Sequence, residues 1–442
     1  MQHFKTSYLL SISFISALGG YLFGFDFAVI SGALPFLRDQ FGLNEYWEGF
    51  ATGSLALGAI IGCLAAGRVA DKYGRRPGLF LAALIFGVSS LAMAFASGLG
   101  VFITARFIAG IGVGMASLLS PMYIAEVSPA QYRGRMVSIN QLTIVLGILI
   151  TNLINYSLRN SGPDAWRWMF GLGAVPSALF IIGVIWLPES PRWLLKVGKE
   201  QKGRAVLEKI GGPEFSSSSM DLIKLSLKGN QQVSYKAVFE KAVFPAVMIG
   251  IVLAVFQQLC GINVVFNYPS NIFASIGASK DDQLLQTVFI GGVNLFFTIL
   301  AMFLVDKIGR RPLMLFGALA LAILYVVIAQ LLAIQSALVG MFLLAAIGTY
   351  AISLGPVTWV LISEIFPNHV RGAASSIAVL CLWSAYFILT FTFPVLAKWI
   401  GMHHTFYIYS GICVLGFLFI RAKVKETKGK TLEELESVFT PH

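Results

Sequence analysis

Charged residues are scarce in this chain of 442 residues, where Asp, Glu, Lys and Arg together make up 12%. A soluble globular protein usually carries about 25% charged residues, so the composition argues against that class. Hydrophobic residues make up 57% of the chain, and the mean hydropathy is +0.78. The sequence therefore predicts an integral membrane protein.

Cysteine and histidine are also few, with four and five residues. The cysteines, Cys63, Cys260, Cys381 and Cys413, fall in apolar runs without paired spacing, which predicts neither a disulfide nor a metal site. The histidines lie in termini or loops, away from any cysteine or serine arrangement typical of an enzyme. We expect no catalytic residue, no metal and no cofactor.

Long apolar runs are what the chain has in abundance. A helix needs roughly 20 residues to cross a hydrocarbon core of about 30 Å. The runs are continuously apolar, whereas strands of a membrane barrel would alternate, so we predict an all-α membrane protein. The twelve predicted spans are 8–30, 47–70, 79–97, 101–125, 136–157, 167–187, 243–268, 284–305, 312–332, 337–363, 373–396 and 404–421.

The basic residues predict the orientation of these spans. Most of the 32 Lys and Arg residues lie in the termini and in the loops after the even-numbered spans. By the positive-inside rule, both termini are predicted to be cytoplasmic. The net charge of +11 is thus a topology signal and does not indicate nucleic-acid binding. The first span lacks a small-residue cleavage site and is too long for a signal peptide. Compact loops favour a bacterial plasma (inner) membrane. On the other face lie Arg38, Arg159, Arg167, Lys280 and Lys398.

The chain contains an internal duplication. "DKYGRRP" at 71–77 recurs as "DKIGRRP" at 306–312, and Glu126 with Arg133 recurs as Glu364 with Arg371. Such a repeat predicts a transporter made of two six-helix halves. The predicted parts are an N-terminal bundle (1–187), a polar cytoplasmic linker with short amphipathic helices (188–241), a C-terminal bundle (242–421) and a cytoplasmic tail (422–442).

The repeated charges could join neighbouring helix ends, because partial desolvation strengthens pairs of carboxylate and guanidinium groups. We expect them to hold the halves in one state and so to act in gating. The alternative is that they only set topology and solvate the loop ends. The predicted gating residues are Asp71, Arg75, Arg76, Glu126, Arg133, Arg135, Asp306, Arg310, Arg311, Glu364 and Arg371.

Eight motifs follow one another along the chain. They are "GGYLFGFDFAVISGA", "GRVADKYGRRP", "ARFIAGIGVG", "PMYIAEVSPAQYRGR", "PESPRWL", "QQLCGIN", "GPVTWVLISEIFP" and "ETKGKTLEELE". With them, the chain resembles the sugar porter family of the major facilitator superfamily over essentially its whole length. The resemblance implies twelve helices in two bundles, alternating access by rocking of the bundles, and a monosaccharide held near the midplane.

Neutral amides lie at depths where a bilayer should exclude them. Carboxamides suit the hydroxyls of a sugar, because they donate and accept without charge. Tryptophans could offer flat faces to a pyranose ring. The alternative is that the amides join helices and the tryptophans form an interfacial belt. A kink near Gly261 would bring Gln258 and Asn263 together. The predicted sugar-binding residues are Gln141, Gln257, Gln258, Asn263, Asn267, Asn294, Trp359 and Trp383, and the resemblance implies sugar contact for all of them except Asn267.

The chain departs from the family pattern at several of these positions. Asn267 stands where the family commonly has the first of two tyrosines, and Tyr268 keeps the second. Leu382 and Tyr386 stand where the family has amides beside the tryptophan, and Ile148 replaces an amide of some bacterial members. Because these changes reshape the pocket, no single sugar can be carried over.

Asp26 is an isolated carboxylate within an apolar run, which is costly unless it pairs or takes a proton. Arg106 is the basic residue well inside a span and is its candidate partner. Three interpretations are open: a static ion pair, a proton carrier and a sugar ligand. Burial and a neighbouring guanidinium act in opposite directions on a carboxylate's pKa, so its proton affinity can differ between two states of a carrier. In the family, proton symporters have Asp here and facilitative carriers commonly have Asn, which implies symport.

The sequence thus predicts monosaccharide import with proton symport through Asp26 and Arg106. Alternatives are a sugar uniporter, a sugar sensor without transport and a multidrug proton antiporter. The expected partners are a monosaccharide, a proton and the lipid bilayer, with no nucleic acid, and we expect a monomer.

Overall fold

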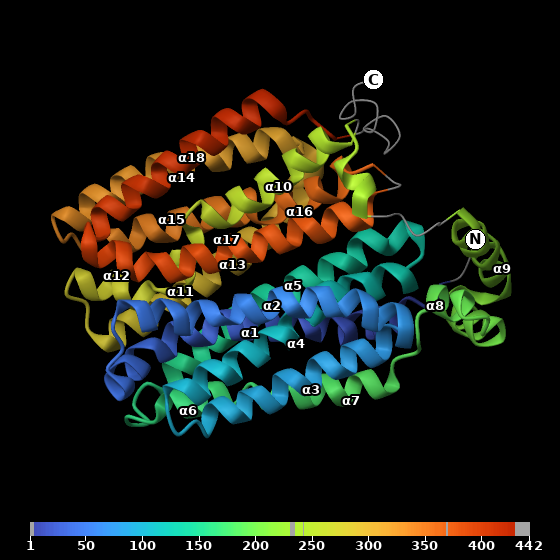
Figure 1. Ribbon diagram of the computed structural model, residues 1–442, viewed down its shortest axis with the longest axis horizontal. Coiled ribbons are helices and arrows are strands. Elements are labelled where there is room, and N and C mark those ends of the chain that lie inside the picture. The colour runs from blue at the N-terminus through green and yellow to red at the C-terminus, as the bar shows by residue number, and fades with distance from the viewer. Residues whose placement is uncertain (1–3, 230–234, 242, 368–369, 429–442) are drawn as a thin grey trace. The chain divides into compact units, whose positions relative to one another are not determined.

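The computed structural model describes residues 4–229, 235–241, 243–367 and 370–428 (Figure 1). Within these residues, twelve helical segments are long and apolar enough to cross a membrane, which confirms the predicted all-α fold with twelve spans. Nine spans are single helices: α1 (Thr6–Phe41), α2 (Glu45–Tyr73), α3 (Arg75–Ala94), α4 (Leu99–Val127), α5 (Ala130–Leu158), α13 (Lys280–Ile308), α14 (Arg310–Ala333), α17 (Arg371–Trp399) and α18 (Met402–Lys423).

The other three spans are each broken into two helices. The sixth span consists of α6 (Ala165–Gly171) and α7 (Ala174–Trp186), the seventh of α10 (Phe244–Leu259) and α11 (Ile262–Asn267), and the tenth of α15 (Val339–Ile352) and α16 (Leu354–Ile365). The predicted kink at Gly261 is present, and this residue has a φ of 90°, which glycine adopts without a steric penalty. The break at Ser353, with φ −126° and ψ −94°, falls inside the predicted run 337–363.

Four further elements lie outside the spans. They are α8 (Pro191–Lys196), α9 (Glu200–Gly229), the 3-10 helix η1 (Tyr235–Phe239) and α12 (Pro269–Ser275). The Ser190 hydroxyl accepts from the backbone N–H of Trp193 and so caps α8. Gly212, with φ 82°, interrupts α9. The described part of the segment 188–241 is therefore largely helical, and its assignment as a cytoplasmic linker remains a prediction.

The described residues fall into two compact units. Unit 1 comprises Met1–Asp26, Gly58–Gly147 and Phe170–Gln232, and unit 2 comprises Phe27–Leu57, Ile148–Met169 and Val233–His442. Since α1, α2, α5 and α6 contribute residues to both units, the units do not follow the predicted bundles, 1–187 and 242–421. That division along the sequence remains a prediction.

Glycines bring the helices of unit 1 close together. A Cβ on Gly58 or Gly62 of α2 would collide with the α4 backbone at Phe107 and Ile111, and a Cβ on Gly114 of α4 would collide with Ala59. Small residues at such contacts let membrane helices approach closely. This packing fixes the part of α4 that carries Arg106.

Candidate functional site

Asp26 and Arg106 form a buried ion pair in unit 1. Asp26 lies on α1 and Arg106 on α4, each with 0% of its surface exposed. Arg106 Nη1 lies 3.4 Å from Asp26 Oδ2. The predicted partnership between the two residues is thus present in the geometry, although their roles remain a prediction.

The hydrogen-bonding capacity of this pair is largely unused. Both Asp26 oxygens and all three Arg106 nitrogens are buried without a hydrogen-bond partner among the described residues. The guanidinium carbon lies 5.8 Å from the centre of the Phe170 ring. Buried polar groups normally have partners, and exceptions call for an explanation. A carboxylate held by one long ion contact is chemically suited to exchange a proton.

Four amides of the seventh span form a hydrogen-bonded series in unit 2. Gln258 Nε2 donates to Gln257 Oε1 over 3.2 Å, and Asn263 Nδ2 donates to Gln258 Oε1 over 2.6 Å. Asn267 Nδ2 donates to the Asn263 backbone carbonyl over 2.7 Å. The turn at Gly261 makes the contact between Gln258 and Asn263 possible, as the sequence predicted.

Gln257 also stabilises the break in the tenth span. Its Nε2 donates to the carbonyls of Gly355 over 2.9 Å and Leu354 over 3.3 Å, next to the break at Ser353. A helix break exposes backbone polar groups that need partners in a membrane. The break lies six residues before Trp359, which is 43% exposed.

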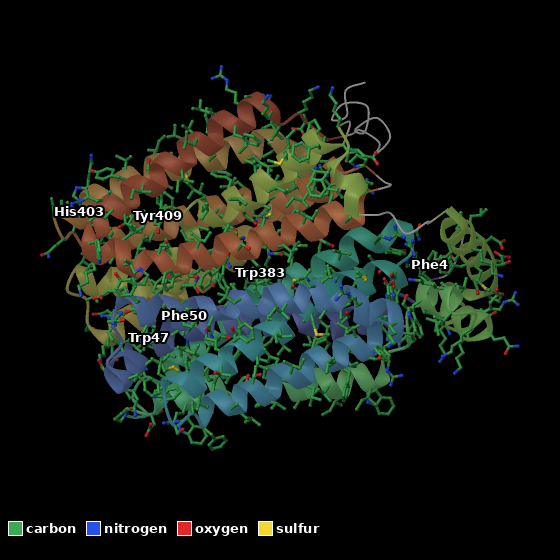
Figure 2. The ribbon with its side chains drawn as sticks, in the orientation of Figure 1. Phe4, Trp47, Phe50, Trp383, His403 and Tyr409 are labelled. Atoms are coloured by element: carbon green, nitrogen blue, oxygen red, sulfur yellow. The ribbon has the colours of Figure 1, made fainter. Side chains whose placement is uncertain are left out.

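The other predicted sugar-binding residues lie on separate helices. Trp383 is buried near the middle of α17 (Figure 2). Asn294 is buried on α13 in unit 2, and Gln141 is half-buried on α5 in unit 1. Their contact with a sugar remains a prediction.

The first charge cluster, in unit 1, consists of Arg75, Glu126, Glu189 and Ser190. Arg75 binds Glu126 through two nitrogens at 2.8 and 2.9 Å, and the Ser190 hydroxyl donates to Glu126 over 2.5 Å. Glu189 accepts from the backbone N–H groups of Arg75 and Arg76, the first residues of α3. A helix N-terminus favours such an anion, because its N–H groups are otherwise unpaired.

The second charge cluster, in unit 2, repeats this arrangement with Arg310, Glu364, Glu426 and Thr427. Arg310 Nη2 binds Glu364 at 3.1 Å, and the Thr427 hydroxyl donates to Glu364 over 2.6 Å. Glu426 accepts from the backbone N–H groups of Arg310 and Arg311 at the start of α14. The internal duplication therefore extends to complete three-dimensional sites.

The sequence interpretation missed Glu189, Ser190, Glu426 and Thr427 as members of these clusters. The signal was available in the sequence. Glu189-Ser190 follows the last span of the first half and Glu426-Thr427 follows that of the second, and the offset between them is nearly the same as the offset between the other repeated charges.

The carboxyl groups of Glu189 and Glu426 differ in their electrostatic surroundings. Burial raises the pKa of Glu189. Burial also acts to raise the pKa of Glu426, but backbone N–H groups outweigh it and the pKa is lowered.

The remaining predicted gating residues have other environments. Asp71 binds Lys196 at 2.9 Å and lies 3.9 Å from Arg75. Arg76 and Arg311 donate to the backbone carbonyls of Ile185 and Arg421. Three more predicted residues with described side chains are Arg371, which donates to the Phe366 carbonyl, Arg133, which donates to the Ala125 carbonyl, and the exposed Arg135. The side chain of Asp306 lies outside the described part of the structure.

A third charged group, the α1–α2–α12 cluster, consists of Arg38, Glu48 and Asn271 in unit 2. Arg38 Nε donates to Glu48 over 3.0 Å, Arg38 Nη2 donates to Asn271 Oδ1 over 2.7 Å, and Asn271 Nδ2 donates to Glu48. Glu48 is only 4% exposed. The three side chains therefore form a closed ring that joins the end of α1 and the start of α2 to α12.

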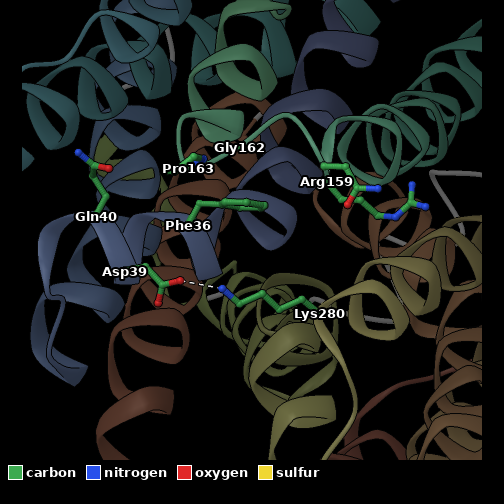
Figure 3. A pocket seen from close by; sticks show the side chains of 8 residues that line it. Phe36, Asp39, Gln40, Arg159, Gly162, Pro163 and Lys280 are labelled. Atoms are coloured by element: carbon green, nitrogen blue, oxygen red, sulfur yellow. Dashed lines mark hydrogen bonds and ion pairs between the residues drawn. The ribbon is translucent and has the colours of Figure 1, made fainter.

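A cavity of about 520 Å³ also lies in unit 2 (Figure 3). Lys280 binds Asp39 at 2.7 Å at its rim, and Arg159 binds the neighbouring Asp281 at 3.2 Å. Its lining residues are Phe36, Asp39, Gln40, Arg159, Asn160, Gly162, Pro163 and Lys280. The predicted sugar-binding amides are not among them, so this cavity is separate from the amide series.

The profile of the family described as "Sugar (and other) transporter" matches residues 12–439. The chain belongs to this sugar transporter family. The D-xylose-proton symporter of Escherichia coli is 40% identical over an alignment of 484 positions, which covers 99% of this chain and 97% of the relative. The arabinose-proton symporter of Bacillus subtilis is 37% identical and covers 98% of this chain and 95% of the relative.

Solved structures give the same answer for the fold. The inward open conformation of the xylose transporter XylE from E. coli matches with a TM-score of 0.87 at 37% identity, covering 98% of this chain and 100% of that one. The chain therefore has the major facilitator fold. As a member of a transporter family, it is a transporter rather than a polytopic enzyme.

The contribution of the α1–α2–α12 cluster to stability can be tested by substitution. We expect Glu48→Ala to lower the free energy of unfolding by about 1–2 kcal/mol, because a buried carboxylate with two partners is lost. Asp39→Ala, which removes a carboxylate 65% exposed, should change it by less than about 0.5 kcal/mol. Thermal unfolding of both purified variants measures the difference, and equal midpoints would show that the ring contributes nothing.

Proposed function

We propose that this protein imports a monosaccharide by alternating access, with proton symport through Asp26 and Arg106. Membership in the sugar transporter family supports the substrate class. Relatives named for proton symport of D-xylose and arabinose, at 40% and 37% identity, support the coupling.

The observation that carries the coupling is the state of the Asp26–Arg106 pair. The pair is fully buried, is held at 3.4 Å, and its five polar atoms lack hydrogen-bond partners among the described residues. A proton on Asp26 would remove the attraction to Arg106, and its release would restore it. For coupled transport, binding of the proton and binding of the sugar must both favour the same conformational change of the carrier.

The sugar is proposed to bind at the amides, where carboxamide groups can exchange their mutual hydrogen bonds for bonds to sugar hydroxyls. The Gln258–Asn263 contact supports this, because it places two carboxamides of one broken span together. The proposed sugar-binding residues are Gln141, Gln257, Gln258, Asn263, Asn294, Trp359 and Trp383. Asn267, the remaining member of the predicted set, is left out because its carboxamide is already engaged by Tyr386 and by the Asn263 carbonyl.

The two repeated charge clusters are proposed to act in gating. Each joins three segments of the chain at helix ends that the positive-inside rule places in the cytoplasm. We propose that both termini are cytoplasmic, that the halves 1–187 and 242–421 move as bundles, and that the protein works as a monomer in a bacterial plasma membrane.

A facilitative uniporter is the second candidate. The burial of both members of the Asp26–Arg106 pair also fits a static ion pair. A relative named as a glucose transport protein, from Synechocystis, is 38% identical and covers 98% of this chain. In this case Asp26 has a structural role only.

Uptake into proteoliposomes separates these candidates. Radiolabelled D-xylose, L-arabinose, D-glucose and myo-inositol are offered with and without an inward proton gradient. We expect at least one sugar to accumulate above its external concentration only with the gradient. Equilibration that ignores the gradient would favour the uniporter, and no uptake of any sugar would contradict the proposed function.

A further inference from the structure

Two departures from the family pattern touch each other in unit 2. The Tyr386 hydroxyl on α17 donates to Asn267 Oδ1 on α11 over 3.0 Å. Asn267 is fully buried, and Tyr386 is 2% exposed. Since Asn267 also donates to the Asn263 carbonyl, its carboxamide is engaged at both ends.

The α11 helix depends on contacts of this kind. It has only six residues, begins after the left-handed Gly261 and ends before Pro269. A helix this short has almost no stability of its own. Its position is therefore decided by its side-chain anchors.

Two side-chain hydrogen bonds between this segment and α17 lie one helical turn apart on α17. One is the bond from Tyr386 to Asn267, and the other is the bond from the Tyr268 hydroxyl to the Thr390 carbonyl over 2.6 Å. Tyr386 is itself fixed by ring contacts with Phe27 and Trp383, with centroids 5.8 Å apart in each case. A rigid aromatic group thus holds the end of α11.

The anchored helix carries Asn263, whose Nδ2 binds Gln258 Oε1. The hydrogen bonds therefore run from Tyr386 to Asn267, from Asn267 to the backbone carbonyl of Asn263, and from the Asn263 carboxamide to Gln258. Loss of the first bond would leave Asn267 Oδ1 buried without this donor and would loosen the turn that orients the Asn263 carboxamide.

We propose that Tyr386, acting through Asn267, is a positioning residue that sets the affinity of the sugar site by holding Asn263 in register with Gln258. Asn267 then supports the position of Asn263 and does not itself contact the sugar. The proposal rests on the proposed function, because it assumes that Gln258 and Asn263 bind the sugar.

Tyr386→Phe removes only the donor and keeps the ring. Tyr325→Phe is the matched control, since the Tyr325 hydroxyl on α14 is fully buried and has no hydrogen-bond partner among the described residues. Asn267→Ala and the double variant Tyr386→Phe/Asn267→Ala complete a double-mutant cycle.

Equilibrium binding is measured in nanodiscs with whichever of tritiated D-xylose, L-arabinose, D-glucose and myo-inositol binds the wild type most tightly. We expect Tyr386→Phe to weaken binding about tenfold, with turnover at saturating sugar kept within about twofold. The double variant should bind within about twofold of Asn267→Ala, because both changes break one connection. Tyr325→Phe should bind as the wild type does.

Hydrogen exchange without sugar tests the anchor itself. Backbone amides of residues 262–268 should exchange faster in Tyr386→Phe than in the wild type. Their exchange rates should be unchanged in Tyr325→Phe. Wild-type affinity in Tyr386→Phe, multiplying effects in the double variant, or unchanged exchange would each overturn the proposal. If the wild type bound none of the four sugars, the proposed function would fall, and this proposal with it.

Discussion

We expect Asp26→Asn to abolish sugar accumulation while sugar exchange continues. Asparagine has nearly the size of aspartate but cannot carry a proton, so the proposed cycle would lose its coupled step. With an inward gradient of one pH unit, each proton supplies about 1.4 kcal/mol, which sustains roughly tenfold accumulation. In proteoliposomes we expect this ratio to fall to about one for the variant, with counterflow exchange retained.

Glu126→Gln provides the matched carboxylate control. Glu126 pairs with Arg75 at the helix ends, away from the Asp26–Arg106 pair. Its neutralisation should slow uptake but leave the accumulation ratio intact. Loss of accumulation in Glu126→Gln together with its persistence in Asp26→Asn would reverse the two assignments.

Gly74→Ala should be the most destabilising of the single changes considered for the charge clusters. Gly74 precedes α3 with φ 104°, a conformation that side chains rarely adopt. A Cβ there would also lie within contact distance of the Glu189 carboxylate that binds the start of α3. We expect a loss of about 2–4 kcal/mol in the free energy of unfolding, measured by thermal unfolding of the purified protein.

Substitution of two other glycines provides a comparison for the expected loss of stability in Gly74→Ala. Gly309, with φ 107°, is the equivalent residue before α14, and a Cβ there would lie 2.8 Å from the Glu426 carboxylate. Gly134 on α5 has open space around its Cβ position. The order of loss should be Gly74→Ala, then Gly309→Ala, with Gly134→Ala unchanged or slightly stabilised. Equal midpoints for Gly74→Ala and Gly134→Ala would refute the strain argument.

The fold was largely predictable because hydropathy and span length constrain membrane helices so strongly. All twelve spans were placed from apolar runs alone, and the turn at Gly261 followed from the need to bring Gln258 to Asn263. The break at Ser353 was not predicted, although Pro356 follows it closely and proline interrupts a helix. The bonds from Gln257, almost a hundred residues earlier, to the carbonyls beside the break have no local signal in the sequence.

The candidate site was predictable only in part. Asp26 and Arg106 are unusual because they lie deep within apolar runs, and these positions pointed to the pair. Glu48 and Asn271 are 223 positions apart, and nothing local in the sequence indicates their bond. The bond between Asn267 and Tyr386 is equally non-local, although both residues had been noted as departures.

The two repeated clusters also bear on how the chain is assembled. In each half, the carboxylate that binds the helix N-terminus, Glu189 or Glu426, follows the last membrane span of that half. During synthesis, the first cluster can therefore close only after six spans have been made, but before the second half exists. The second cluster needs residues 426 and 427, beyond the twelfth span. A ribosome product that stops after Lys423 would hold every membrane helix and still lack the group that completes its second half.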